Sequence, residues 1–83
     1  MKSILDEAKE IVDGSRRNDY GTPKENHQRT ADLWSTYLGV RISAEQVCML
    51  NILQKISRSM NKTTRDTLVD IAGYARNIEL LEP

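Results

Sequence analysis

Six polar residues in the second half of the chain have the types and the spacing to form a binding site. They make two stripes at helical spacing, one of Asn51, Lys55 and Arg58 and one of Asp66, Asp70 and Tyr74. Counted outward from Lys62, in the short turn predicted between them, the members of the two stripes fall at matching levels. Two helices joined by a short turn pack as an antiparallel hairpin, so the cationic stripe is expected to face the acidic one.

The facing stripes have two interpretations, and the sequence leaves both open. In the first, they are ion pairs that fix the register of the hairpin, each worth less than about 1 kcal/mol. In the second, they line a polar cavity. There Asp66 and Asp70, one helical turn apart, share a divalent cation such as Mg²⁺, while Lys55 and Arg58 bind phosphate oxygens.

A second polar stretch lies between Asp19 and Pro23. A turn that leads into a helix accounts for Gly21, as a residue with positive φ, and for Pro23, as the first helical residue. It does not account for Asp19 or Tyr20, which are therefore candidate ligand-binding residues.

Three other side chains have a structural explanation beside a functional one. His27 and Trp34 share the apolar face of a predicted helix, where a core position competes with ligand binding or base stacking. Cys48 is the only cysteine and sits in an apolar run, which predicts a buried, inert thiol and excludes an internal disulfide. The chain has no Gly-rich phosphate loop, no His-Glu-x-x-His motif and no Ser/His/Asp set.

Apolar periodicity and capping residues predict four helices that position these groups. They run from Ser3 to Val12, ended by Asp13-Gly14; from the Thr22 cap to Gly39; from the Ser43 cap to Met60; and from Thr63 or Thr64 to about Leu81. Two starts, at Thr22 and Ser43, have the capping-box pattern. The third helix is apolar on more than one face and is predicted to be the central one.

No segment alternates with period two, so strands are not expected. The sequence therefore predicts a single all-α domain over residues 1–83, a small bundle of about four helices in which the third and fourth form an antiparallel hairpin.

The composition limits the classes of partner. The chain has 83 residues, with 12 Lys and Arg against 12 Asp and Glu, so no long-range field draws it to nucleic acid or to an anionic membrane. No apolar stretch is long enough to span a bilayer, and the acidic residues near the start do not fit a signal peptide, which predicts a cytoplasmic protein. A chain of this size has a thin core, which favours a homo-oligomer, most simply a dimer.

Four ordered motifs cover nearly the whole chain: Asp19-Tyr20-Gly21-x-Pro23-x-x-Asn26-His27, Ala31-Asp32-Leu33-Trp34-Ser35-x-Tyr37-Leu38-Gly39, Leu53-x-Lys55-Ile56-x-Arg58, and Arg65-Asp66-x-Leu68-Val69-Asp70-Ile71-Ala72-Gly73-Tyr74-Ala75. Together they resemble a family of small phage and prophage proteins of unassigned function. This resemblance implies a protein made in an infected or lysogenic bacterial host.

The last motif is also similar to the helices of the all-α nucleoside triphosphate pyrophosphohydrolases, the superfamily of MazG and the dimeric dUTPases. Those enzymes commonly dimerise and hold magnesium between an E-x-x-E pair on one helix and an E-x-x-D pair on the next. Here Asn51, Lys55 and Arg58 stand where the first pair should be, and only Asp66 and Asp70 remain of the second. The resemblance therefore implies the scaffold and nucleotide binding, while the departure argues against the standard catalytic mechanism.

These observations lead to two functional hypotheses of different classes. In the first, the protein binds a nucleotide or another phosphate-bearing ligand, with or without pyrophosphohydrolase-like hydrolysis. In the second, it is a non-catalytic phage interaction protein that inhibits a host defence or regulatory protein. The candidate ligand-binding residues are Asp19, Tyr20, Asn26, Trp34, Asn51, Lys55, Arg58 and Tyr74, and the candidate metal ligands are Asp66 and Asp70.

Overall fold

A computed structural model describes residues 1–81 of the chain, and every regular element in that range is helical. In chain order the elements are α1 (Ile4–Glu10), the π-helical turn η1 (Ile11–Ser15), α2 (Arg16–Tyr20), α3 (Pro23–Leu38), α4 (Ala44–Arg58) and α5 (Arg65–Leu81). The predicted all-α fold is confirmed. Over the described residues, no helix combines the length and apolar character that crossing a bilayer requires.

Local sequence signals set the boundaries of the middle helices. The capping box at the start of α3 forms as predicted, since the backbone N–H of Glu25 donates to Thr22 Oγ1 at 3.2 Å and the Glu25 carboxylate accepts from the backbone N–H of Thr22. Ser43 and Gln46 form the same reciprocal pair at the start of α4. Gly39 ends α3 in the left-handed conformation, with φ of 71°.

The first helix does not end where the sequence predicts. Gly14 is helical, and the chain continues through η1 and α2 until Gly21, which has φ of 86° and donates its N–H to the Arg17 carbonyl at 3.1 Å. Residues 16–20, predicted to be a polar connection, are therefore helical. A glycine permits a helix end but does not require one, and the helix ends at Gly21, whose positive φ is as predicted, seven residues after Gly14.

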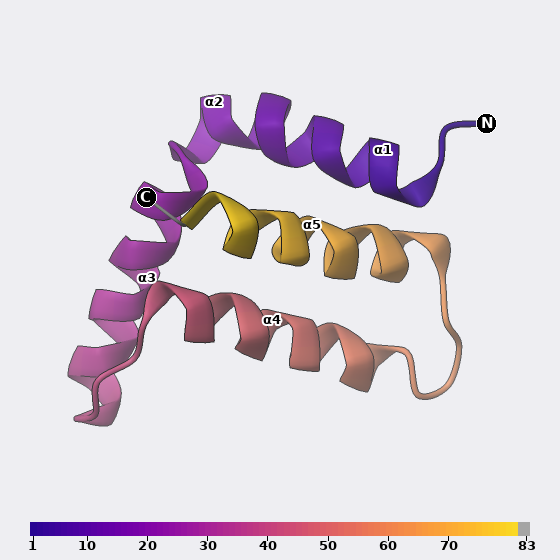
Figure 1. The fold of residues 1–83 in the computed structure, drawn as a ribbon. Coiled ribbons are helices and arrows are strands. Elements are labelled where there is room, and N and C mark those ends of the chain that lie inside the picture. Colours follow the sequence, from indigo (N-terminus) through magenta and orange to yellow (C-terminus); the bar gives the residue numbers. More distant parts are fainter. Residues whose placement is uncertain (82–83) are drawn as a thin grey trace.

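The helices are arranged around α5 (Figure 1). α1 runs alongside α5 on one side, α4 runs antiparallel to it on the other, and α3 crosses one end of the pair formed by α4 and α5. The antiparallel hairpin of α4 and α5 is thus confirmed. The prediction that α4 is central was wrong, because α5 is the helix that contacts α1, α3 and α4.

The core is built from small side chains. Its buried apolar members are Ala8, Val12, Ala31, Ala44, Val47, Cys48 and Val69. Of these, only Val47 and Cys48 are larger than alanine and almost completely removed from solvent. Small residues let helix backbones approach closely, so the fold depends on many short-range contacts and on few large anchors. Cys48 is buried as predicted, and burial raises the pKa of its thiol to about 11.

We expect alanine at two glycine positions to change stability in opposite directions. Gly14→Ala should stabilise the protein by about 0.5–1 kcal/mol, because Gly14 is helical and an added Cβ meets no atom within 4 Å. Gly21→Ala should destabilise it by about 1–2 kcal/mol, because alanine is strained at a φ of 86°. Urea denaturation of the two variants measures both changes, and a loss of stability in Gly14→Ala would mean that the first helix does end at Gly14.

Candidate functional site

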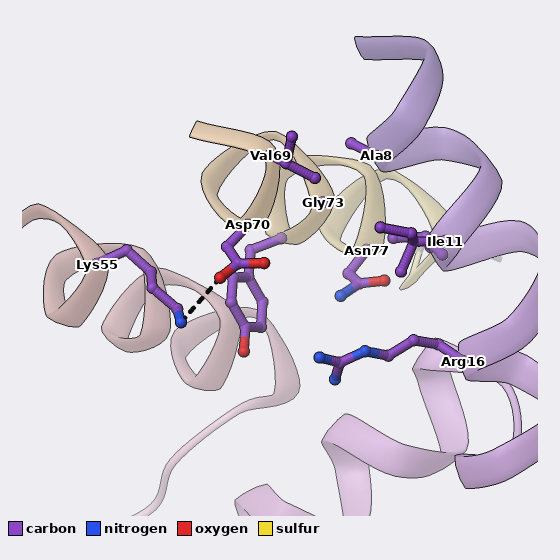
Figure 2. A pocket seen from close by; sticks show the side chains of 10 residues that line it. Ala8, Ile11, Arg16, Lys55, Val69, Asp70, Gly73 and Asn77 are labelled. Carbon is purple, nitrogen blue, oxygen red and sulfur yellow. Dashed lines mark ion pairs between the residues drawn. The ribbon is translucent and has the colours of Figure 1, made fainter. Parts of the chain in front are cut away.

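A small pocket lies where α5 meets α4 on one side and the segment α1–η1–α2 on the other (Figure 2). Its volume is about 60 Å³. The apolar part of its wall comes from α1, η1 and α5, and the polar part from α2, α4 and α5. The residues that line it are Ala8, Ile11, Val12, Arg16, Lys55, Val69, Asp70, Gly73, Tyr74 and Asn77.

One ion pair of the predicted hairpin register forms part of the pocket wall. Lys55 Nζ lies 2.9 Å from Asp70 Oδ2, with 18% of the lysine side chain and 40% of the aspartate side chain exposed. The predicted pairing of levels is therefore confirmed at Lys55 and Asp70. Both side chains also line the pocket. The same two residues therefore form an ion pair that fixes the hairpin register and contribute to the wall of a polar cavity, so the two interpretations do not exclude each other.

Arg16 is one of two polar residues of this pocket that the sequence did not predict. It enters the pocket from the side opposite Lys55 (Figure 2), and its guanidinium forms no ion pair with any residue in the range 1–81. Its Cζ lies 5.6 Å from the centre of the Tyr20 ring, so a cation–π contact within α2 orients it. A helix that continues through Gly14 is required to bring Arg16 beside Val12, and the prediction ended that helix too early.

Asn77 also lines the pocket and was not predicted. It lies seven residues after Asp70 and three after Tyr74, so it extends the same helical stripe by one turn. The predicted stripe ends at Tyr74, because each of its members was expected to face a residue of α4. The same helical spacing, continued along α5, includes Asn77.

A second pocket, of about 20 Å³, adjoins the first. Both are lined by Val12, Arg16 and Asn77, and the second adds Tyr20, Asn26 and His27 among others. These shared residues place two groups of candidate residues next to each other. Lys55, Asp70 and Tyr74 line the first pocket, and Tyr20 and Asn26 line the second. We refer to the two pockets together as the cleft.

His27 lines the second pocket and lies near Tyr74, which lines the first. The residue is 7% exposed, and the centre of its ring lies 6.1 Å from the centre of the Tyr74 ring, with the two planes tilted by 58°. Burial, with a smaller contribution from the nearby Arg16 charge, lowers the pKa of the imidazole below its usual value of 6.5. The histidine is therefore neutral at pH 7, and its ring adds no further positive charge to the cleft.

Five candidate residues lie outside the cleft. Asp19, Arg58 and Asp66 are exposed, and Trp34 and Asn51 are half-buried on α3 and α4. The amide of Asn51 donates to a carbonyl of its own helix at 2.9 Å. The predicted pairing of Arg58 with Asp66 does not form an ion pair among the residues that the structure describes.

The residues proposed to hold Mg²⁺ do not form a suitable donor set. Asp66 is exposed, and a carboxylate oxygen of Asp70 is occupied by the Lys55 ammonium. Between residues 1 and 81, no group of three or more His, Cys, Asp or Glu side chains is placed to bind a metal ion. Mg²⁺ requires near-octahedral oxygen coordination, which two separated aspartates do not supply. Magnesium binding stays a prediction that the geometry does not support.

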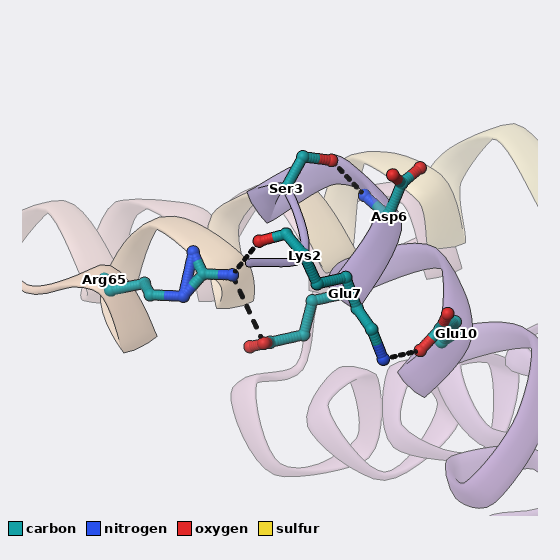
Figure 3. A network of polar contacts seen from close by, with 6 residues as sticks. All are labelled: Lys2, Ser3, Asp6, Glu7, Glu10 and Arg65. Atoms are coloured by element: carbon teal, nitrogen blue, oxygen red, sulfur yellow. Dashed lines mark hydrogen bonds and ion pairs between the residues drawn. The ribbon is translucent and has the colours of Figure 1, made fainter.

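Ion pairs at both ends hold the α1–η1 wall of the cleft against α5. Near the N-terminus, Arg65 Nη2 donates to the Lys2 carbonyl at 2.7 Å and contacts Glu7 Oε1 at 3.3 Å (Figure 3). At the other end, Arg76 donates from Nε and Nη2 to the two carboxylate oxygens of Asp13, at 3.2 and 3.0 Å. The Arg76 hydrogen bonds lower the pKa of the Asp13 carboxyl. These contacts hold α1 and η1, which precede Arg16 in the chain, against α5.

Comparison with known proteins gives a family and close relatives. Residues 3–80 match the family described as "Domain of unknown function (DUF6378)". The chain is 50% identical over 82 residues to the Gene 55 protein of Mycobacterium phage L5 and 43% identical over 79 residues to that of Mycobacterium phage D29. These alignments cover 96% and 94% of the chain, but 53% and 52% of the relatives, so the chain spans about half their length. No solved structure matches.

The lowered pKa of His27 predicts a loss of stability in weak acid. The unfolded chain takes up a proton near pH 6.5, whereas the folded protein resists protonation until a lower pH, so stability is full above pH 6.5 and falls as the pH drops below it. His27 is the only histidine in the chain. In thermal denaturation between pH 8 and pH 5, the Tm of the wild type should therefore decrease as the pH is lowered below 6.5. The Tm of His27→Gln should depend less on pH. Equal slopes for the two proteins would show that another group controls this range.

Proposed function

The chain belongs to the DUF6378 family, and because the description of that family assigns no function, we propose one from the cleft. In this proposal the cleft binds a phosphate-bearing small molecule, with a nucleotide as the first candidate. The resemblance to a family of phage proteins of unassigned function, predicted from the four motifs, is confirmed by the phage relatives. The proposal itself is supported by the charges and dimensions of the cleft.

The observation that carries the proposal is the position of two cations on opposite sides of one pocket. Arg16 and Lys55 both line it, and Asp70 is the only carboxylate among the lining residues of the described chain. The pocket therefore has an excess of positive charge, although the chain as a whole is neutral. A guanidinium and an ammonium that converge on one cavity favour an anion with several oxygen acceptors, which is the chemistry of phosphate.

The size of the cleft limits what enters it. Pockets that enclose a whole drug-sized ligand usually measure about 300–1,000 Å³. A pocket of about 60 Å³ accepts a phosphate group between Arg16 and Lys55 and leaves the rest of the molecule outside it. The neighbouring pocket offers the Tyr20 ring and the Asn26 amide to that remainder, an aromatic surface and a hydrogen-bonding group that suit a nucleobase.

Binding is the whole of the proposed activity. The resemblance that the last sequence motif predicts, to the all-α nucleoside triphosphate pyrophosphohydrolases, would imply the same class of ligand. Hydrolysis by those enzymes depends on a cage of carboxylates around magnesium, and the described residues offer no such group. We therefore propose a protein that retains phosphate-bearing molecules without hydrolysing them.

Arg16→Gln tests the proposal with little effect on folding. Arg16 is exposed and has no ion-pair partner among residues 1–81, so the variant should melt at the wild-type temperature. A hydrogen bond to a charged group contributes about 1.5–3 kcal/mol, so affinity should fall by roughly 10- to 100-fold. The probes are inorganic phosphate, pyrophosphate and nucleoside mono-, di- and triphosphates, measured by thermal shift and calorimetry. Arg29→Gln changes another exposed arginine, on α3 and outside the cleft, and is the matched control.

Binding of no probe by the wild-type protein would overturn the proposal. The same holds if Arg16→Gln and Arg29→Gln weaken binding equally, because the effect would then report general charge. In either case the alternative hypothesis, a phage protein that inhibits a host protein through its helical surface, becomes the better explanation.

A pair of variants separates the two roles of Lys55. Lys55→Met removes a cation from the cleft and leaves Asp70 without its partner, so both affinity and Tm should fall. Lys55→Met combined with Asp70→Asn removes both charges, which should recover part of the lost Tm without restoring affinity. If Lys55→Met lowers Tm and leaves phosphate binding unchanged, the ion pair serves only to fix the hairpin register.

A further inference from the structure

Helix α4 is apolar on two opposite faces. One face contributes Ala44, Val47 and Cys48 to the core. The other is exposed to solvent and consists of Met49, Leu53 and Ile56 with Met60 just beyond the helix end and Leu50 beside them; we call this set the outer stripe. The exposed fraction of these residues ranges from 41% for Ile56 to 73% for Met60.

The spacing of the outer stripe is that of a helix-pairing seam. Met49, Leu53, Ile56 and Met60 follow one another at intervals of four, three and four residues, which places apolar side chains along one line of the helix. No charged residue occurs from Gln46 to Gln54. Lys55, the next residue, turns away from the outer stripe to Asp70. Protein interfaces are depleted of charge at their centres in the same way.

The surface area of the chain fits one missing interface. The accessible surface is 5952 Å². A monomer of 9.5 kDa is expected to expose about 5,050 Å², so the chain exposes roughly 900 Å² more than expected. A specific interface of standard size buries about 800 Å² on each partner. The excess is therefore of the size that one dimer contact removes.

We infer that two copies of this chain associate through the outer stripe, with their α4 helices antiparallel across a two-fold axis near Leu53. A stripe without charge can face its own copy without repulsion, which a basic or acidic face cannot do. In the antiparallel arrangement Leu53 meets Leu53 of the second copy, and Met49 lies near the partner's Ile56. The chain carries no net charge, so the two copies do not repel each other at long range.

The interface and the cleft are on different sides of α4. Lys55 reaches the cleft from the face that packs on α5, and the outer stripe lies on the opposite face. The dimer therefore leaves the cleft open and does not depend on the proposed ligand. Conversely, loss of the dimer should leave phosphate binding unchanged, so that failure of either proposal is distinguishable from failure of the other.

Sedimentation velocity of the purified 83-residue chain tests the inference. The wild type should sediment as a dimer at concentrations of about 100 μM, and Leu53→Glu should sediment as a monomer because it places two carboxylates together at the axis. Leu33→Glu is the matched control: Leu33 is exposed on α3, at 65% against 58% for Leu53, and its substitution should leave the dimer intact. Circular dichroism should show the same helical content for all three proteins.

A cysteine at the axis gives a second, independent readout. Leu53→Cys should form a disulfide-linked dimer under mild oxidation, while Leu33→Cys should not, and the native Cys48 is buried. Three results would each overturn the inference: a wild type that stays monomeric, a Leu53→Glu variant that stays dimeric, or cross-linking through Leu33→Cys alone. A monomeric wild type would indicate that another chain, or a further segment of the kind present in the longer relatives, covers the outer stripe.

Discussion

The two hydrogen bonds between Arg76 and Asp13 hold the segment that leads into the candidate site against α5. They connect the last turns of α5 to η1, and η1 is the point at which the first helix departs from regular α-helical geometry. Because α2 continues directly from η1, the direction in which Arg16 projects depends on how η1 is held. The bidentate geometry fixes both distance and orientation, which a single contact would not do. An ion pair outside the cleft thus helps to position one of the two cations that line it.

The small side chains of the core explain why such contacts matter. Gly73 of α5 is buried beside Val12 of η1, and a Cβ at Gly73 would be in ordinary van der Waals contact with the Val12 side chain, at 3.5 Å. Helices that approach this closely bury little apolar volume, so ion pairs and helix caps have a larger part in fixing their positions. The same shortage of large buried residues leaves apolar side chains of α4 in contact with water. The sequence thus places small apolar residues in the core and leaves several large apolar residues of α4 exposed on the surface.

The sequence predicted the fold better than it predicted the site, and particular residues explain why. Helix starts at Thr22 and Ser43 depend on side-chain to backbone bonds within three residues, so local sequence is sufficient to identify them. The pair Lys55 and Asp70 followed from counting across one short turn. Arg16 could not be found in that way, because its position depends on Gly14 remaining helical and on contacts with α5, more than fifty residues away. Trp34 and Arg58 had suitable chemistry, but their places on α3 and α4 keep them away from the cleft.

The π-helical turn has a consequence for how this chain can vary. Each residue of an α-helix turns the chain by about 100°, and a π-turn accommodates one residue beyond the regular count. Removing one residue between Ile11 and Ser15 would therefore let the helix become regular and would keep the residues after it close to their present orientation. Removing one residue from a regular part of α1 would instead rotate Arg16 and Tyr20 away from the cleft by about 100°. A one-residue gap in homologues is therefore compatible with an arginine in the site only where it falls within the π-helical turn.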